Sequence, residues 1–210
     1  MRVIKLPEKT VERLSKYRRA LLVAYENGKH YIFSHEIASM FHITPVQVRR
    51  DLMLISHSGT LQKGYDVKEL INLLSKILDT DNDVNVAIIG LGNLGRAIMG
   101  YFAGKRPKLK IVAAFDVNPD KIDKVYAGVK CYHFDKITEI IKKESIEIGI
   151  ITVPAEEAPK VAEKLVLAGI KGILNYSPCS ISVSPNIYLE EYDMITSLEK
   201  VAYFVKHHAK

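Results

Sequence analysis

The chain has 210 residues, of which 48% are hydrophobic and 26% charged, the balance of an ordinary globular protein. It contains no run of 18 apolar residues, so we expect no membrane-spanning helix and no membrane partner. The N-terminal segment at residues 1–8 is too short and too charged for a signal peptide, so we expect none. Two cysteines, Cys131 and Cys179, can make neither a disulfide framework nor a four-cysteine metal site, which favours a reducing cytoplasm and no metal.

The charge is concentrated at the start of the chain. Residues 1–80 carry 13 Lys/Arg and 8 Asp/Glu, whereas residues 81–210 carry 17 and 16, so nearly all of the net +6 belongs to the first part. A basic module followed by a nearly neutral one suggests that the first part binds a polyanion.

The basic part has the pattern of a helix-turn-helix. A helix over 9–26 and a short strand over 31–33 precede a helix expected to be capped by Ser34. Another helix starts at Thr44, with Thr44 as N-cap, proline at the next position and Gln47 closing a capping box. Its apolar stripe leaves Arg49 and Arg50 pointing outward, where arginine can contact guanine or phosphate in DNA.

The segment 56–67 is predicted to be a β-hairpin, the wing of a winged helix, because glycines at 59 and 64 bracket it. Lys63 lies near its tip and Tyr65 follows. The candidate DNA-contacting residues are therefore Thr44, Gln47, Arg49, Arg50, Lys63 and Tyr65. A helix over 67–78 and a polar linker then end a DNA-binding domain at residues 1–80.

The run from Val84 to Ile89 is continuously apolar, like a buried parallel strand, and opens into G-x-G-x-x-G. Such glycines permit a tight turn and let the backbone approach the pyrophosphate of a dinucleotide at a helix N-terminus. The motif comprises Gly90, Leu91, Gly92, Asn93, Leu94 and Gly95. A second apolar run ends in Asp116-Val117, where an acid can accept hydrogen bonds from the adenosine ribose and disfavour a 2′-phosphate.

Strand and helix patterns alternate after residue 84, which predicts a mostly parallel sheet in an α/β domain of Rossmann type. Strands are expected at 84–89, 110–115, 129–132, 147–153, 172–174 and 187–189, and helices at 93–103, 136–143 and 156–168. Ligands bind at the carboxyl ends of such strands. Two of these ends supply the further candidate cofactor residues Thr152, Val153, Pro154, Asn175, Tyr176 and Pro178.

The last helix, over 194–207, is apolar on too many sides for an isolated surface helix. It is expected to pack against a second subunit or between domains. The predicted organisation is therefore a winged-helix domain at 1–80, a Rossmann-like domain at 84–193 and a dimerisation helix at 194–210.

Taken together, these motifs resemble the Rex family of redox-sensing bacterial repressors over nearly the whole chain. The resemblance rests on the order of six segments: QVRRDL at 47–52, GY at 64–65, GLGNLG at 90–95, FD at 115–116, TVPA at 152–155 and AGIKGILN at 168–175.

The resemblance implies a homodimer with an exchanged C-terminal helix that represses transcription from double-stranded operator DNA. The resemblance also implies that NADH closes the dimer and releases the operator, whereas the empty or NAD⁺-bound protein can bind a palindromic operator. The family's switch network maps onto Arg19, Tyr101 and Asp193. Two positions depart from the family pattern: Leu61 replaces a wing arginine, and Met194 replaces an aromatic residue near the nicotinamide.

Three other interpretations remain open. An NAD-dependent oxidoreductase would use the same glycine turn, but no catalytic group follows the fourth strand and no substrate domain remains. A DNA-binding regulator could instead take coenzyme A as its ligand, because domains that bind coenzyme A share this fold. A paralogue could bind DNA without sensing any nucleotide.

Overall fold

The computed structural model describes residues 6–57, 59–60, 63–79, 82–102 and 108–208. The chain forms two compact units, Met1–Asp81 and Asn82–Lys210. In the described ranges, every helix is too short or too polar to span a bilayer.

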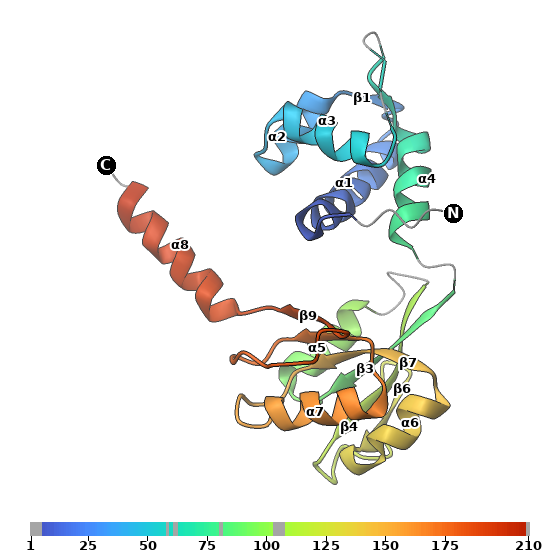
Figure 1. Ribbon diagram of the computed structural model, residues 1–210, viewed down its shortest axis with the longest axis vertical. Coiled ribbons are helices and arrows are strands. Elements are labelled where there is room, and N and C mark those ends of the chain that lie inside the picture. Colours follow the sequence, from blue (N-terminus) through green and yellow to red (C-terminus); the bar gives the residue numbers. More distant parts are fainter. Residues whose placement is uncertain (1–5, 58, 61–62, 80–81, 103–107, 209–210) are drawn as a thin grey trace. The chain divides into compact units, whose positions relative to one another are not determined.

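The first unit is a small helical domain with a two-stranded sheet (Figure 1). Its helices are α1 (Glu8–Glu26), α2 (Ser34–Phe41), α3 (Pro45–Leu54) and α4 (Val67–Leu78), and its strands are β1 (Tyr31–Ile32) and β2 (Tyr65–Asp66). Antiparallel β1 and β2 join the chain before α2 to the chain before α4. One apolar core, including Leu14, Val48 and Leu70, holds all four helices together.

The predicted wing lies between α3 and β2. The backbones of Thr60 and Gly64 exchange two hydrogen bonds, of 2.8 and 2.9 Å, which bring the two sides of the loop together. Leu61 and Gln62 lie outside the described residues, so the departure from the family pattern at Leu61 has no structural account.

Two helix starts differ from their predictions. Ser34 is the first residue of α2 rather than its cap, and the Glu36 carboxylate instead accepts the Phe33 N–H at 2.8 Å. Thr44 caps α3 as expected, since its hydroxyl accepts the Gln47 N–H at 3.2 Å. The Gln47 side chain does not close a capping box, because its amide donates to Asp51 at 3.0 Å.

The second unit is a seven-stranded sheet in the order β5-β6-β4-β3-β7-β8-β9, parallel except for the β5–β6 pair. This order confirms the predicted Rossmann-type sheet. The strands are β3 (Val84–Ile89), β4 (Leu109–Asp116), β5 (Val125–Tyr126), β6 (Val129–His133), β7 (Ile146–Ile151), β8 (Gly172–Asn175) and β9 (Tyr188–Glu191). The sequence had given no sign of β5, whose two residues are too few for a pattern.

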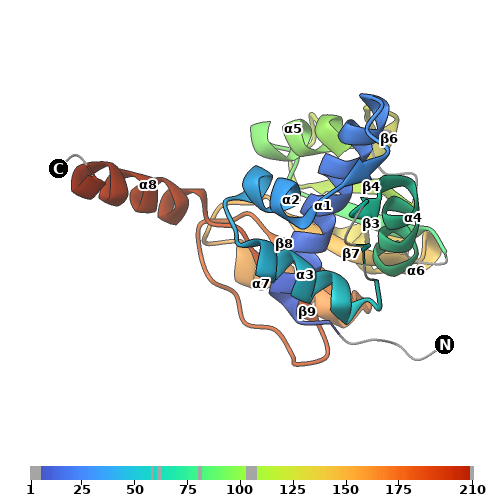
Figure 2. The same ribbon diagram turned by 90° about the horizontal axis from the view of Figure 1, so that it is seen from above.

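Helices cover both faces of this sheet: α5 (Asn93–Phe102) on one, and α6 (Ile137–Lys143) and α7 (Ala158–Ala168) on the other (Figure 2). A short 3₁₀ turn, η1 (Phe134–Lys136), leads into α6. Alternate residues of a strand face opposite sides, so Val86 and Ile88 pack in the α5 core while Ala87 and Ile89 pack in the α6–α7 core. The continuously apolar strand follows from this double burial.

The last helix, α8 (Met194–His208), is exposed at every position described from Met194 to His207. Ile195, Leu198 and Val201 are each more than half exposed. An isolated chain gains nothing from keeping such side chains in water, so α8 carries an apolar surface that is open to a partner.

Candidate nucleotide site and DNA-binding face

The first and third glycines of the turn are required by close backbone packing. Gly90 has φ +97°, and a Cβ there would lie 2.8 Å from the Thr152 carbonyl oxygen. A Cβ on Gly95 would lie 2.1 Å from the Gly90 carbonyl oxygen. The turn therefore brings the start of α5 against the end of β3.

Gly92 has a different role, because a Cβ there would meet nothing within 4 Å. It lines a cavity of about 520 Å³ at the carboxyl ends of β3, β4 and β7. The open space in front of Gly92, at the N-terminus of α5, suits a group that must approach the backbone closely and carries negative charge. These features fit a dinucleotide pyrophosphate.

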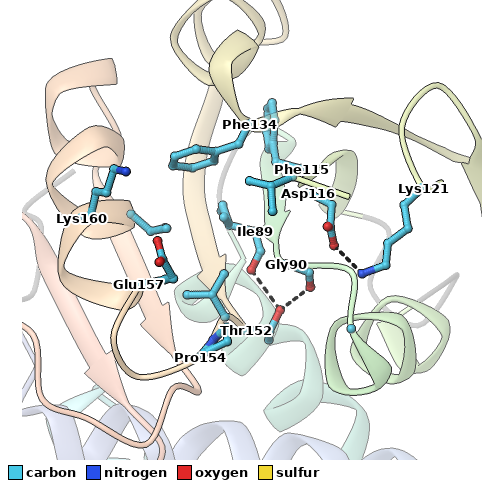
Figure 3. Close-up of a pocket in the computed structure, with 14 residues that line it drawn as sticks. Ile89, Gly90, Phe115, Asp116, Lys121, Phe134, Thr152, Pro154, Glu157 and Lys160 are labelled. Carbon is cyan, nitrogen blue, oxygen red and sulfur yellow. Dashed lines mark hydrogen bonds and ion pairs between the residues drawn. The ribbon is translucent and has the colours of Figure 1, made fainter. Parts of the chain in front are cut away.

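Figure 3 shows the side chains around this cavity. Of the residues predicted from sequence, it is lined by Gly90, Gly92, Asp116, Val117, Thr152, Val153 and Pro154. Sequence reasoning missed Phe134, Lys121, Glu157, Lys160 and Val161, which line it as well. Spacing could have found Glu157, Lys160 and Val161, since they follow Pro154 at the start of a predicted helix, but Phe134 comes from η1 and carries no motif.

A smaller cavity of about 240 Å³ shares Thr152 and Val153 with the first. It is also lined by Leu94, Tyr176, Pro178, Asp193, Met194 and Ile195. The two cavities together extend from the Asp116 side, past the glycine turn, to the start of α8, as an extended dinucleotide requires.

Four predicted cofactor residues line neither of these cavities. Leu91 is fully buried, and its N–H donates to Asp116. Asn93 accepts a hydrogen bond from Arg96 at 2.9 Å, and Gly95 packs on Gly90. Asn175 is buried and holds the 175–179 loop, accepting the Ser177 N–H and donating to the Cys179 carbonyl oxygen. These four residues are therefore placed to hold the site in shape rather than to contact a nucleotide through their side chains.

Asp116 is almost buried at the end of β4, where it binds three donors. Its Oδ2 accepts the Leu91 N–H at 2.7 Å and the Lys121 ammonium at 2.9 Å, and its Oδ1 accepts the Asn118 N–H at 2.9 Å. Burial opposes ionisation of this carboxyl, but Lys121 and the two N–H groups outweigh it, so its pKa lies below the ordinary value. Asp116 is therefore an ionised acceptor at neutral pH.

Thr152 ties the glycine turn to the neighbouring strand. Its hydroxyl lies 2.7 Å from the Gly90 carbonyl oxygen and 3.1 Å from that of Ile89, and donates to this pair of acceptors. The Thr152 N–H also donates to Ile89 at 2.9 Å. The side chain thus fixes the shape of the cavity floor.

In the first unit, the predicted DNA contacts cluster on and around α3. Arg49 and Arg50 are exposed, and Arg49 donates to the Ser34 hydroxyl at 3.1 Å. Lys63 is exposed on the wing, with its ammonium 5.8 Å from the centre of the Tyr31 ring. Tyr65 is only 7% exposed, so little of it is available to DNA. Tyr31 is half-exposed beside Lys63 and is a further candidate for DNA contact. The sequence pattern of its two-residue strand did not predict this role.

A buried carboxylate anchors α3 to α1. Asp51, 1% exposed, accepts two hydrogen bonds from Arg13 at 2.6 and 2.7 Å, one from the Tyr17 hydroxyl at 2.9 Å and one from Gln47. Burial opposes its ionisation, but these hydrogen bonds more than offset that, and the pKa of Asp51 lies below its ordinary 3.8. Gln47, proposed from sequence for DNA, is thereby held to Asp51.

Replacing Asp51 with alanine is expected to lower the free energy of unfolding of the first unit by about 2–4 kcal/mol, because the buried Tyr17 hydroxyl and Arg13 lose their acceptor. Since the pKa is depressed, the stabilisation by Asp51 is complete above its ordinary value of 3.8 and is lost as pH falls through the lower folded value. Urea unfolding of the full chain at about pH 6 and pH 3 measures both effects. Equal pH dependence in wild type and Asp51→Asn would contradict this account.

Comparison with known proteins decides the family. Redox-sensing transcriptional repressor Rex proteins from Listeria welshimeri and Lactobacillus acidophilus are 37% and 35% identical to the chain and cover 97% and 98% of it, with 95% and 97% of their own lengths matched. The chain belongs to the Rex family. Family models described as "CoA binding domain" and "Putative DNA-binding protein N-terminus" match residues 81–179 and 5–52.

Solved Rex-family structures agree over the same extent. The repressor RSP in complex with NAD⁺ and operator DNA has a TM-score of 0.89 at 32% identity, covering 97% of this chain and 94% of its own. RSP in complex with NADH has a TM-score of 0.86 at the same identity. The Rex relatives are named as repressors and not as enzymes, which weighs against the oxidoreductase interpretation.

The residues of the implied switch belong to different units. Arg19 is exposed on α1 of the first unit, whereas Tyr101, on α5, and Asp193 belong to the second. Asp193 caps α8: its Oδ1 accepts the Ile195 N–H at 2.8 Å, and its Oδ2 accepts the Thr196 hydroxyl at 2.6 Å. Those hydrogen bonds lower the pKa of Asp193, which keeps the carboxylate charged at neutral pH.

Proposed function

We propose that the chain is a transcriptional repressor that binds double-stranded operator DNA through its first unit and leaves it when NADH binds its second. Transcription then follows the NADH/NAD⁺ ratio, and the repressor acts in the cytoplasm. The observation that carries this proposal is the near full-length match to Rex repressors. One chain holds both a winged helix with exposed arginines and a dinucleotide cavity.

The nucleotide roles follow the two cavities. The pyrophosphate lies over Gly92 and the α5 N-terminus, and the adenosine ribose lies at Asp116. The adenine fits the apolar walls made by Val117, Phe134 and Val161. The nicotinamide half extends past Thr152 and Val153 toward Tyr176 and Pro178, which line the smaller cavity. NADH and NAD⁺ are the pair to which this site responds.

The DNA roles follow exposure and charge. Arg49 and Arg50 reach base edges or phosphates from α3, while Lys63 contacts the backbone from the wing. Thr44, at the exposed α3 N-terminus, contacts a phosphate. Gln47 acts mainly by holding α3 in place, because it is hydrogen-bonded to Asp51. Tyr65 acts mainly by holding the wing in place, because its side chain is buried in the core.

The function is tested by titrating the chain onto a library of palindromic duplexes, with no nucleotide, NAD⁺ or NADH present. We expect one or a few palindromes to bind without nucleotide or with NAD⁺ and to dissociate with NADH. The chain has no tryptophan, so NADH fluorescence reports direct binding with little background. Operator binding that is unchanged by NADH would contradict the redox-sensing role. It would instead support the interpretation of a paralogue that binds DNA without sensing any nucleotide.

We propose that α8 joins two copies into a homodimer by exchange, which removes its apolar side chains from water. Leu198 is 70% exposed in the single chain and would be buried in the dimer. Leu198→Glu is therefore expected to shift the protein from dimer to monomer, because dimerisation would bury an unpaired charge. Sedimentation velocity measures the shift. Glu199→Gln, a neighbouring change that removes rather than adds charge, serves as the control. A Leu198→Glu protein that stays dimeric would exclude α8 from the interface.

Asp193, Arg19 and Tyr101 form the proposed switch, in which Asp193 must keep its charge. Asp193→Asn retains a side chain that caps helices well, so α8 should persist, while pairing with an arginine is lost. We expect operator binding to be kept and release by NADH to weaken about tenfold. Gel shifts over an NADH series measure this, with Thr196→Ser as the cap-preserving control. An unchanged midpoint would remove Asp193 from the switch.

Coenzyme A is a second candidate ligand, because the family model that matches residues 81–179 is described as a CoA binding domain. A 3′-phosphate has no hydroxyl proton to donate to the Asp116 carboxylate, which favours the unphosphorylated ribose of NADH over that of coenzyme A. Competition between coenzyme A and bound NADH decides the matter. Displacement at equal or lower concentration would favour coenzyme A.

A further inference from the structure

The Asp116 carboxylate has little capacity left for a ribose. Each carboxylate oxygen offers about two lone pairs. Oδ2 already accepts from the Leu91 N–H and the Lys121 ammonium, and Oδ1 accepts from the Asn118 N–H. One acceptor position remains, on Oδ1, so the two ribose hydroxyls cannot both donate to this carboxylate, as they could to an unpaired one.

Lys121 supplies what the carboxylate no longer does. Its side chain is 25% exposed and lines the same cavity, and its ammonium has three N–H donors, one of which points to Asp116. A 2′-hydroxyl can donate to Oδ1 and accept from Lys121 at once. The other lysine of the cavity, Lys160, lies on the α7 side, across from the Asp116–Lys121 pair (Figure 3).

The ion pair also changes the field at the ribose. An unpaired Asp116 would repel a 2′-phosphate, whereas Asp116 paired at 2.9 Å with Lys121 has no net charge. The charge of Asp116, which by sequence disfavours a 2′-phosphate, is thus neutralised by Lys121, five residues further along the chain.

We propose that Lys121 is a specificity-determining residue that weakens the discrimination against a 2′-phosphate. The site accepts NADPH, less tightly than NADH, and loses most of that binding when Lys121 is uncharged. This inference rests on the proposed nucleotide function, because it concerns which dinucleotides the same cavity admits.

The test compares dissociation constants of the full chain for NADH and NADPH, read from nucleotide fluorescence, in wild type and Lys121→Met. Wild type should bind both. In Lys121→Met the NADPH constant should rise about tenfold or more, because the counter-charge is gone. The NADH constant should change less than about threefold, because the position on Asp116 Oδ2 that Lys121 vacates can accept a ribose hydroxyl in place of the lost Lys121 contact. The ratio of the two constants therefore rises about tenfold.

The controls separate this effect from damage and from general electrostatics. Lys124→Met removes the same charge from an exposed side chain three residues further on and should leave the ratio unchanged. Asp116→Asn should lower the ratio, and Lys121→Arg should return it toward the wild-type value. Lys121→Gln replaces Lys121→Met if the latter fails to fold by circular dichroism.

Two results would overturn the proposal: an unchanged ratio in the uncharged variant, or no binding of NADPH to wild type at millimolar concentration while NADH binds. Failure of NADH itself to bind wild type would instead overturn the proposed function, so the two failures are distinguishable.

Discussion

The double variant Arg49→Ala/Arg50→Ala is expected to lose operator binding by about 100-fold or more while keeping NADH affinity. Both side chains are exposed on α3, and each good arginine contact to DNA is worth about 1–3 kcal/mol. Loss of two cationic contacts should also flatten the salt dependence of binding, by about two in the log–log slope. Fluorescence anisotropy of a labelled operator at several salt concentrations measures both quantities.

The matched control removes two charges elsewhere in the same unit. Lys68 and Lys76 are exposed on α4, so Lys68→Ala/Lys76→Ala tests the effect of net charge without α3. We expect this control to weaken operator binding only a few-fold. Equal losses in the two double variants would mean that the unit's overall charge, and not α3, reads the operator. Arg49 also donates to Ser34, so an Arg49→Lys variant shows whether that contact orients the side chain.

Alanine at Gly92 and at Gly95 should have opposite consequences. A methyl group at Gly92 meets no protein atom within 4 Å but projects into the cavity, so the fold should persist while the pyrophosphate is held off the backbone. Loss of one or two charge-assisted hydrogen bonds corresponds to roughly 10- to 100-fold weaker NADH binding. Gly92→Ala should therefore still bind operator and resist release by NADH.

Gly95→Ala places its methyl group 2.1 Å from the Gly90 carbonyl oxygen, inside the distance at which atoms repel strongly. We expect a loss of about 2–4 kcal/mol in the stability of the second unit, because α5 must shift away from β3. Thermal unfolding followed by circular dichroism, beside NADH titration, separates the two variants. Gly100→Ala, also with open space around its Cβ but outside the cavity, is the control. A destabilised Gly92→Ala protein would contradict the assignment.

Much of the fold could be predicted from sequence because its signals are local. The continuously apolar run at 84–89 predicted a strand buried on both faces, and the structure confirms it as β3. Thr44-Pro45 predicted the start of α3, which the structure also confirms. Helix caps were less predictable where two residues compete. The Glu36 carboxylate, three residues ahead, captures the Phe33 N–H and makes Phe33 the cap, leaving Ser34 inside α2 to accept from Arg49.

The sequence alone determined that the chain carries a basic winged helix and a parallel sheet with a glycine turn, since spacing, periodicity and charge are properties of neighbouring residues. Only the tertiary structure decided how the polar side chains divide between folding and binding. Asp51 draws Gln47 toward α1, and Lys121 occupies part of the carboxylate that the motif offered to a ribose. These hydrogen-bond partners depend on which strands and helices pack together. A local sequence pattern does not contain that information.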